Sequence, residues 1–360
     1  MKRRLSISLQ ILVSVLWVGS LIACSTPTPA PTTAAPTAVP PTAVAPTTPP
    51  PTPVPPTPIP AVTLAPVGHL TAKRPYVLAF ANWNETNSFS VLVRKGVEAV
   101  AKRYGVTVIS MDNKQDPQQA NINADNAITQ KVDFYFQYNQ DTEINTRVGQ
   151  KLIAAGIQGI AIQVPMTGFP LYRVDNVLAG SLGGRAIAEK AKADWNVEPI
   201  MLVMGYPESG ALFQSRANGA MAGAKTVFPN IKIYEDTTKG DVERCRSVVA
   251  DFLTAHPNEK IILWTHVDQM ALSCLSAVKG ANRLGDVYIA QTGGDPSIFP
   301  ELRKADSIIV GTASFFPEMW GEDLVPLAIQ MLNGEVTAPP VIEPKTIFIT
   351  HDNINTYYPQ

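Results

Sequence analysis

The residues of this chain that are suited to ligand chemistry are aromatic rings and hydrogen-bonding side chains that follow predicted strands. They are Trp83, Asn87, Phe89, Asn139, Asp141, Arg216, His266, Asp268, Asp295, Phe315 and Glu318. An aromatic ring offers a flat apolar face, whereas a carboxylate or a guanidinium group holds two hydrogen-bonding partners at once. A polyol matches both, because its C–H groups are apolar and its hydroxyls donate and accept. This mixture favours a site for a small polar ligand such as a sugar.

Motifs that carry catalysis or bind phosphate are absent from the sequence. It contains no G-x-x-x-x-G-K-[ST], G-x-G-x-x-G, H-E-x-x-H or G-x-S-x-G pattern. The chain has four scattered histidines, His69, His256, His266 and His351. We therefore predict no metal site, no cofactor and no enzymatic activity. The enzyme alternative would need a base and a nucleophile in one cleft, for which His266 with Asp295 or Glu318 are the nearest candidates.

Short apolar runs alternate with amphipathic stretches from about residue 73 onward. The apolar runs predict strands at 76–81, 106–111, 132–137, 158–163, 200–204, 232–235, 261–264 and 287–290. The stretches between them predict helices at 90–104, 213–228, 241–255 and 270–278. Three further helices are predicted: one begins at 116, one ends at 156, and one follows 175–176 and continues through 191. Strands this apolar are buried on both faces, as in a parallel sheet flanked by helices. We predict an α/β fold of two doubly wound parallel-sheet lobes that binds its ligand beyond the carboxyl ends of the strands.

The first 23 residues have the pattern of a secretory signal peptide. Three cations at positions 2–4 precede an uncharged apolar run from Leu5 to Ala23. The run ends in Leu-Ile-Ala-Cys, which resembles the bacterial lipobox and implies that Cys24 is acylated and becomes the new N-terminus. Ile22 is larger than the usual lipobox residue at that position. The alternative is an uncleaved transmembrane anchor. Either arrangement holds the body on the extracytoplasmic face of a membrane, in the periplasm or at the cell surface.

Residues 24–74 are predicted to form a stalk behind the lipidated cysteine. From Ser25 to Ala72 the sequence has no Asp, Glu, Lys or Arg and is dominated by Pro, Thr and Ala. Proline lacks the amide donor that helices and sheets need, and few large apolar side chains are present to offset the entropy of ordering. An extended, disordered segment is expected, and a Pro-rich recognition segment is the alternative.

The charge and the cysteines of the mature chain limit its partners. Removal of the three signal cations leaves 26 Lys and Arg against 30 Asp and Glu, a net charge near −4. No basic footprint for nucleic acid is present. Besides Cys24, the chain has Cys245 and Cys274, which could pair in an oxidising compartment or remain two buried thiols on separate helices.

Several short segments carry a resemblance to a known family. They are Thr86-Asn87-Ser88-Phe89, Asp141 before the third helix, Asp175-Asn176, Arg216-Ala217-Asn218-Gly219, Leu253-Thr254-Ala255-His256-Pro257 and Asp268-Gln269-Met270-Ala271-Leu272. From Tyr76 to about Ile349 the chain resembles the periplasmic sugar-binding family typified by ribose-binding protein, which is related in fold to the ligand-sensing part of LacI-type repressors. The resemblance implies that Asn87, Phe89, Asp141 and Arg216 contact the ligand.

Three positions depart from that family pattern. Val267, Gly293 and Phe315 stand where ribose binders carry Asn, Asp and Gln, so we do not expect a ribose pocket. We add Trp83, His266, Asp295 and Phe315 to the predicted ligand-binding residues. The export signal and the lack of a helix-turn-helix exclude a repressor.

The resemblance also implies a three-segment hinge and a transport role. The predicted crossings lie near 163–165, 315–317 and 343–345. They assign 75–163 and 316–343 to the first lobe, and 164–315 and 344–360 to the second. The implied function is capture of a monosaccharide or polyol by lobe closure and delivery to the permease of an ABC importer. A receptor for a nucleoside or a signalling furanose is the alternative, in which Trp83 or Phe315 would stack on a base.

Overall fold

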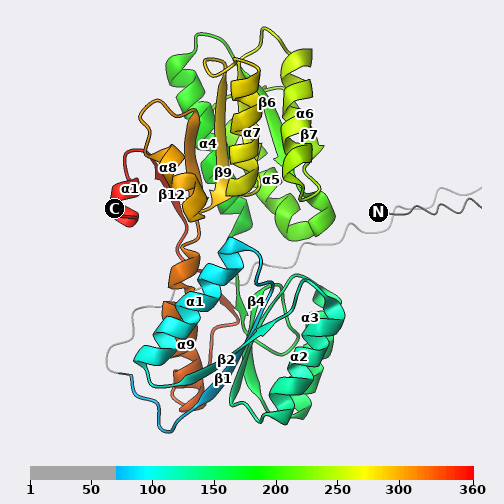
Figure 1. The fold of residues 1–360 in the computed structure, drawn as a ribbon, viewed down its shortest axis with the longest axis vertical. Helices are drawn as coiled ribbons and strands as arrows, with labels where there is room; N and C mark the ends of the chain where they lie inside the picture. Colours follow the sequence, from blue (N-terminus) through cyan, green and yellow to red (C-terminus); the bar gives the residue numbers. More distant parts are fainter. Residues whose placement is uncertain (1–69) are drawn as a thin grey trace, which may run out of the picture. The chain divides into compact units, whose positions relative to one another are not determined.

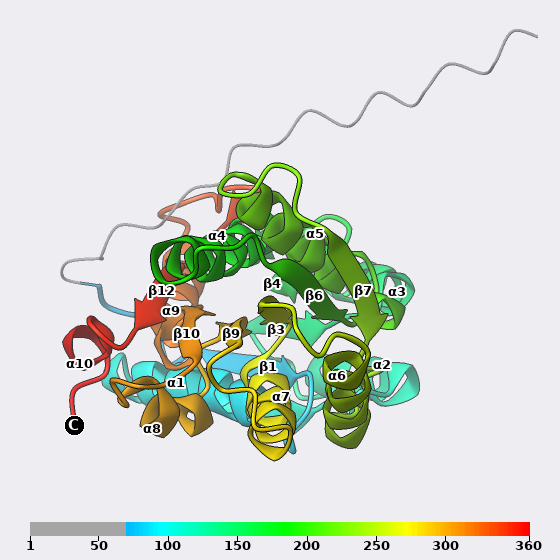
Figure 2. The ribbon, with the colours of Figure 1, turned by 90° about the horizontal axis from the view of Figure 1, so that it is seen from above.

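The computed structural model describes residues 70–360. The predicted signal peptide, the predicted acylation site at Cys24 and almost all of the predicted stalk lie outside the described residues. Within residues 70–360, no helix is both long and apolar enough to cross a membrane. Two six-stranded sheets carry the fold, and helices cover both faces of each sheet (Figures 1 and 2).

The first sheet forms the first lobe and has the strand order β11-β5-β4-β3-β1-β2, with all neighbours parallel. Its strands are β1 (Val77–Asn82), β2 (Thr107–Asp112), β3 (Phe134–Asn139), β4 (Gln158–Gln163), β5 (Leu171–Tyr172) and β11 (Val341–Ile342). Helices α1 (Ser88–Arg103) and α9 (Trp320–Leu332) cover one face, and α2 (Pro117–Thr129) and α3 (Thr142–Ala154) cover the other. Every residue of β3 is buried, and four of its six residues are Phe or Tyr, as expected for a strand covered on both faces.

The second sheet forms the second lobe and has the order β12-β10-β9-β8-β6-β7. Its strands are β6 (Ile200–Gly205), β7 (Ile233–Thr237), β8 (Ile261–Thr265), β9 (Val287–Gly293), β10 (Ile309–Ser314) and β12 (Ile347–Thr350), and β12 alone in this sheet is antiparallel to its neighbour. Helices α4 (Asn176–Asp194) and α5 (Ala211–Lys225) cover one face, and α6 (Val242–Ala255), α7 (Asp268–Gly280) and α8 (Phe299–Leu302) cover the other (Figure 2). Short 3₁₀ turns η1 (Pro207–Ser209), η2 (Pro296–Ile298) and η3 (Pro317–Met319) and helix α10 (Ile354–Tyr357) complete the lobe and its connections.

The glycine-rich segment 180–184 lets α4 and α5 approach each other closely. A Cβ atom on Gly180 would lie 1.9 Å from the carbonyl oxygen of Arg216, and one on Gly184 would lie 1.9 Å from that of Ala220. Only glycine fits at such a backbone contact. This packing fixes α5, and with it Arg216, against the second sheet.

The predicted α/β fold with two parallel-dominated sheets is confirmed, and the chain passes between the sheets three times, after β5, β10 and β11. One predicted boundary is wrong. The sequence predicts that residues 164–315 belong to the second lobe. In the structure, however, Leu171 and Tyr172 pair with Ala161 and Ile162 of β4 in the first sheet. A strand of two residues has no periodicity to detect, and its place is decided by pairing with β4 and β11. The first crossing therefore follows Tyr172.

Candidate functional site

A cavity of about 530 Å³ lies beyond the carboxyl ends of strands from both sheets. Its first-lobe lining comes from the end of β3 and from segments that follow β1, β2 and β3, and its second-lobe lining comes from segments that follow β6, β7, β8, β9 and β10. The lining consists of Trp83, Asn87, Phe89, Gln115, Tyr138, Gln140, Tyr206, Ser209, Phe213, Arg216, Gly240, Val242, His266, Val267, Asp268, Gln269, Met270, Gly293, Asp295 and Phe315. Open parallel sheets place ligands at this edge.

The cavity brings together seven of the eight predicted ligand-binding residues. They are Trp83, Asn87, Phe89, Arg216, His266, Asp295 and Phe315. Asp141 is not part of the lining. Its carboxylate caps α3 and accepts a hydrogen bond from the Ile144 amide at 2.9 Å, while the preceding residue, Gln140, faces the cavity. A ligand contact for Asp141 therefore stays a prediction without support from the cavity geometry.

Sequence reasoning missed several lining residues, above all Tyr138, Gln140, Tyr206 and Phe213. Tyr138 belongs to β3 and directly follows the predicted strand at 132–137. Tyr206 precedes the turn η1, which carries no motif. The positions shortly after a predicted strand were the available signal for Tyr138, Gln140 and Tyr206, and applying this signal to every strand would have found all three. Asn139 and Glu318, which we considered, do not line the cavity.

Arg216 is a buried cation held by neutral groups. Its side chain donates to Asn176 Oδ1 at 2.6 Å, to the His266 carbonyl at 3.2 Å and to Thr292 Oγ1 at 3.3 Å. The guanidinium carbon lies 5.0 Å from the ring centroids of both Phe213 and Phe315. Within residues 70–360 it forms no ion pair. Burial lowers its pKa from 12.5 to about 10, so it remains charged at neutral pH.

Asp268 organises the loop that presents Asp295 to the cavity. Its Oδ2 accepts hydrogen bonds from the amides of Gly294 and Asp295, each at 2.8 Å, and its Oδ1 accepts one from Thr312 Oγ1 at 2.7 Å. Burial raises the pKa of Asp268 from 3.8 to about 7, although these hydrogen bonds act in the opposite direction. A Cβ atom on Gly293 would lie 2.2 Å from Asp268 Oδ2. Glycine at 293, where ribose binders carry Asp, is therefore required by this loop.

His266 is packed as a neutral ring and is poorly suited to act as a base. Its ring centroid lies 5.5 Å from those of Tyr206 and Phe213, and its Nδ1 is 3.4 Å from the Met204 carbonyl oxygen. Burial, assisted by the charge of Arg216, lowers the pKa of His266 from 6.5 to about 3. A general base works best with a pKa near the working pH, so this environment speaks against the enzyme alternative. Within residues 70–360, no three His, Cys, Asp or Glu side chains form a group able to hold a metal ion.

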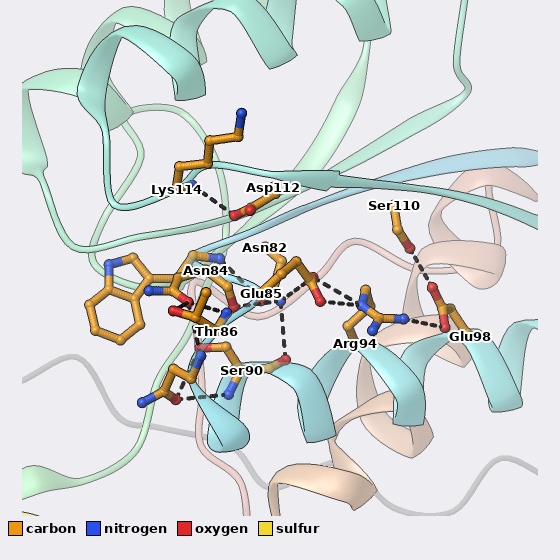
Figure 3. Close-up of polar contacts among 12 residues, drawn as sticks. Asn82, Asn84, Glu85, Thr86, Ser90, Arg94, Glu98, Ser110, Asp112 and Lys114 are labelled. Carbon is orange, nitrogen blue, oxygen red and sulfur yellow. Dashed lines mark hydrogen bonds and ion pairs between the residues drawn. The ribbon is translucent and has the colours of Figure 1, made fainter. Parts of the chain in front are cut away.

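The first-lobe wall is fixed by a polar network in the segment between β1 and α1 (Figure 3). Asn84 Oδ1 accepts hydrogen bonds from the amides of Thr86 and Asn87, at 2.5 and 2.9 Å. Glu85 accepts from Asn82 Nδ2 at 2.6 Å and forms an ion pair with Arg94 at 2.9 Å. These contacts hold in place the backbone that carries Trp83 and Asn87.

The aromatic rings of the first-lobe wall pack against one another. Phe89 meets Phe315 edge-on, with the ring centroids 6.1 Å apart, and meets Trp320 at 5.4 Å. Trp83 lies 6.4 Å from Tyr138. Such packing fixes the ring orientations before any ligand arrives. Asn87 caps α1, because its Oδ1 accepts a hydrogen bond from the Ser90 amide at 3.1 Å. The cap uses the side-chain oxygen of Asn87, so the Nδ2 group of the same side chain points away from the Ser90 amide.

Curated relatives and solved structures resemble most of the chain. The ribose import binding protein of Bacillus subtilis is 23% identical over 269 residues, covering 73% of this chain and 84% of that protein. The one from Salmonella typhimurium is 25% identical over 282 residues, covering 76% and 91%. A periplasmic solute-binding protein from Actinobacillus succinogenes with bound D-allose has a TM-score of 0.70 at 20% identity, covering 78% and 100%. A solute-binding protein from Mycobacterium smegmatis with bound glycerol has a TM-score of 0.69 at 22% identity, covering 79% and 97%.

A family model places these similarities in one group. The model for a periplasmic binding protein domain matches residues 78–336, which include most strands of both sheets and all the cavity-lining segments. With its two doubly wound lobes and a cavity at the facing strand ends, the chain belongs to the periplasmic binding protein domain family.

Proposed function

We propose that this protein is an extracytoplasmic solute-binding lipoprotein that captures a monosaccharide or polyol between its lobes and delivers it to an ABC importer. The observation that carries the proposal is the cavity itself, in which aromatic rings and buried hydrogen-bonding groups from both lobes face one space. A sugar offers apolar C–H faces to the rings and hydroxyls to the polar groups. Relatives whose names state ribose, D-allose or glycerol as ligand, including ABC transporter solute-binding proteins, support this class.

Each group in the cavity has a proposed role. Trp83, Phe89 and Phe315 stack on the sugar faces, and Arg216 and Asp295 form charge-assisted hydrogen bonds with hydroxyls. Asn87 and His266 add neutral hydrogen-bonding positions. A buried hydroxyl without a partner costs about 1–3 kcal/mol, so the complete pairing of hydroxyls determines which sugar binds.

Closure is the proposed binding mechanism. The ligand contacts both lobes, and its higher affinity for the closed arrangement shifts the population toward closure around the three connections between the lobes. The closed form is the one that we propose the permease recognises. The comparisons with ABC transporter components support this partner.

The anchor proposal concerns the predicted signal peptide of residues 1–23, Cys24 and the predicted stalk. Wild-type protein is expected to partition into detergent as an acylated protein, whereas Cys24→Ala should remain unlipidated because the acylated thiol is gone. The measurement is incorporation of labelled fatty acid. Equal labelling of the variant and the wild type would reject the lipobox assignment.

A thermal-shift screen tests the ligand class. Monosaccharides and polyols are assayed one by one beside nucleosides, furanose derivatives and amino acids. A ligand at 100 times its dissociation constant adds about 2.7 kcal/mol to the stability, so a true ligand raises the melting temperature measurably. Phe315→Ala is the matched variant, since loss of the stacking face should weaken the same ligand. A screen that responds only to nucleosides would replace the sugar proposal with the nucleoside alternative.

A further inference from the structure

Cys245 and Cys274 lie on neighbouring helices of the second lobe, with their sulfur atoms 3.0 Å apart. Cys245 is in the first turn of α6, and Cys274 is in the middle of α7. Both side chains are fully buried, and both cysteines are free thiols in this structure. A closer approach of about 1 Å would bring the two sulfurs to the length of a disulfide bond.

The compartment makes this proximity chemically significant. Family membership places the protein outside the cytoplasm, and disulfides form and persist in oxidising extracytoplasmic compartments. We propose that Cys245 and Cys274 are joined by a disulfide bond in the exported protein. This inference rests on the extracytoplasmic location in the proposed function, and it is independent of which ligand the cavity takes.

Formation of the bond is a balanced two-electron oxidation. The two thiols lose two protons and two electrons, and a disulfide of a thiol oxidase accepts them and becomes a dithiol, through a mixed disulfide with one of the two cysteines. Burial raises the pKa of the Cys274 thiol, so little thiolate is present once the lobe has folded. Oxidation therefore takes place while the exported chain is still folding.

The proposed bond lies directly behind one wall of the ligand cavity. Val242, at the start of α6, and Gln269 and Met270, at the start of α7, line the cavity. Cys245 follows Val242 by one helical turn, and its sulfur is 3.7 Å from the Met270 carbonyl oxygen. A covalent link at this point ties together the two helix ends that form the wall.

The link also closes a chain segment that contains β8 and His266. Its ends are 29 positions apart, and a loop of that length restricts the unfolded chain. In the chain-entropy model, the disulfide bond should lower the equilibrium constant for unfolding by roughly two to three powers of ten. The cavity wall is thereby fixed before ligand binds, which reduces the ordering that binding requires.

Peptide mapping tests the bond directly. Full-length protein from the cell envelope is quenched in acid, denatured, alkylated without reduction, digested and analysed by mass spectrometry. We expect one pair of cross-linked peptides, one with Cys245 and the other with Cys274. The mass of the pair should equal the sum of the two peptide masses minus two hydrogen atoms. Cys24 does not interfere, because its peptide has a different sequence. Alkylation of both cysteines in the envelope-derived protein would overturn the inference.

Thermal unfolding tests the consequence of the bond. Wild-type protein that has been unfolded, reduced and refolded in dithiothreitol should melt at least roughly 5 °C below the oxidised protein. The double variant Cys245→Ala/Cys274→Ala is the control, and its melting temperature should not respond to dithiothreitol. A cross-linked wild type whose melting temperature is unchanged by reduction would contradict the stabilising role. If the protein binds sugars but contains no cross-link, only the disulfide inference is rejected. If the protein is cross-linked but binds no sugar, only the proposed ligand class is rejected.

Discussion

Ser88 of the first lobe donates a hydrogen bond to the carboxylate of Asp295 in the second lobe. Gln269 supports this contact, because its Nε2 lies 3.1 Å from Ser88 Oγ and 3.0 Å from Asp295 Oδ2. Ser88 is the first residue of α1, and Asp295 precedes η2, so the contact joins the segments that follow β1 and β9. This direct bond between the lobes stands beside the ligand cavity, and it exists only while the two segments are in contact.

Ser88→Ala should weaken closure. Loss of a hydrogen bond to a charged group shifts the ligand-free protein away from the arrangement with the lobes in contact, and we expect the ligand affinity to fall by about threefold to tenfold. Small-angle X-ray scattering and calorimetry are the measurements. Ser276→Ala is the matched control, because that hydroxyl bonds only to the Leu272 carbonyl of its own helix at 3.0 Å. Equal affinities for Ser88→Ala and the control would show that the contact has no part in closure.

Arg216→Lys should severely reduce ligand binding while the protein still folds. Lysine keeps the charge but lacks the planar group that donates to Asn176, His266 and Thr292 and lies between two phenylalanine rings. Charge-assisted hydrogen bonds contribute about 1.5–3 kcal/mol each, which predicts roughly a tenfold to hundredfold loss of affinity. Isothermal titration with the ligand found in the screen measures it. Wild-type affinity in this variant would remove Arg216 from the site.

Asp141→Ala separates the family resemblance from the cavity geometry. The resemblance implies a ligand contact, whereas the structure shows a helix cap outside the lining. From the geometry we expect a stability loss of about 1 kcal/mol and an affinity within roughly threefold of wild type. The same titration gives the affinity, and urea unfolding gives the stability. A loss as large as that of Arg216→Lys would mean that Asp141 reaches the ligand after closure.

The pH dependence of stability contains two opposing contributions. In the folded state the pKa of Asp268 is raised to about 7, so the folded protein keeps a proton that the unfolded chain loses above pH 3.8. The stabilisation that comes from this proton is fully present below pH 3.8 and is lost as the pH rises to 7. The lowered pKa of His266, about 3, acts in reverse, so its contribution is present above pH 6.5 and is lost as pH falls toward 3. Each shift corresponds to a contribution on the order of 4 kcal/mol. In the wild type the two should largely cancel between pH 4 and 6.5.

Single variants should reveal the two contributions with opposite slopes. Asp268→Asn removes the first, so its free energy of unfolding should rise with pH from 4 to 6.5 more steeply than that of wild type. His266→Gln removes the second, so its free energy of unfolding should fall over the same range. The neighbouring charges of Arg216 and Asp295 remain in both variants. Urea unfolding at intervals of pH measures the slopes, and parallel profiles for all three proteins would contradict the assignment.

Gly293→Ala should destabilise the loop behind the cavity. Gly293 has a φ of +139°, and an added Cβ would lie 2.2 Å from Asp268 Oδ2, so the carboxylate that holds Gly294 and Asp295 must move. We expect a loss of about 2 kcal/mol or more in the free energy of unfolding, together with weaker ligand binding. Gly285→Ala is the control, because no atom lies within 4 Å of its added Cβ, and it should change stability by less than about 0.5 kcal/mol. Equal melting temperatures for the two variants would be inconsistent with this account.

The sequence by itself determined the elements and their fold class. Short apolar runs such as Ile261–Trp264 favour strands buried on both faces, and amphipathic stretches that begin with a cap such as Asp116 favour helices that cover a sheet. The same patterns located most of the cavity, because the carboxyl ends of parallel strands meet at one edge. Trp83, Asn87, Phe89, His266 and Asp295 were found from that rule and from the resemblance.

Only the tertiary structure decided which side chains share one space. Asp141 and Gln140 are adjacent in sequence, yet one caps α3 and the other faces the cavity, because helix capping fixes the direction of Asp141. The 3.0 Å separation of the Cys245 and Cys274 sulfurs depends on the packing of α6 against α7, and the place of Leu171 and Tyr172 depends on strand pairing. Local propensity acts over a few residues, whereas these relationships are set by contacts between segments far apart in the chain, and their residue types alone do not encode them.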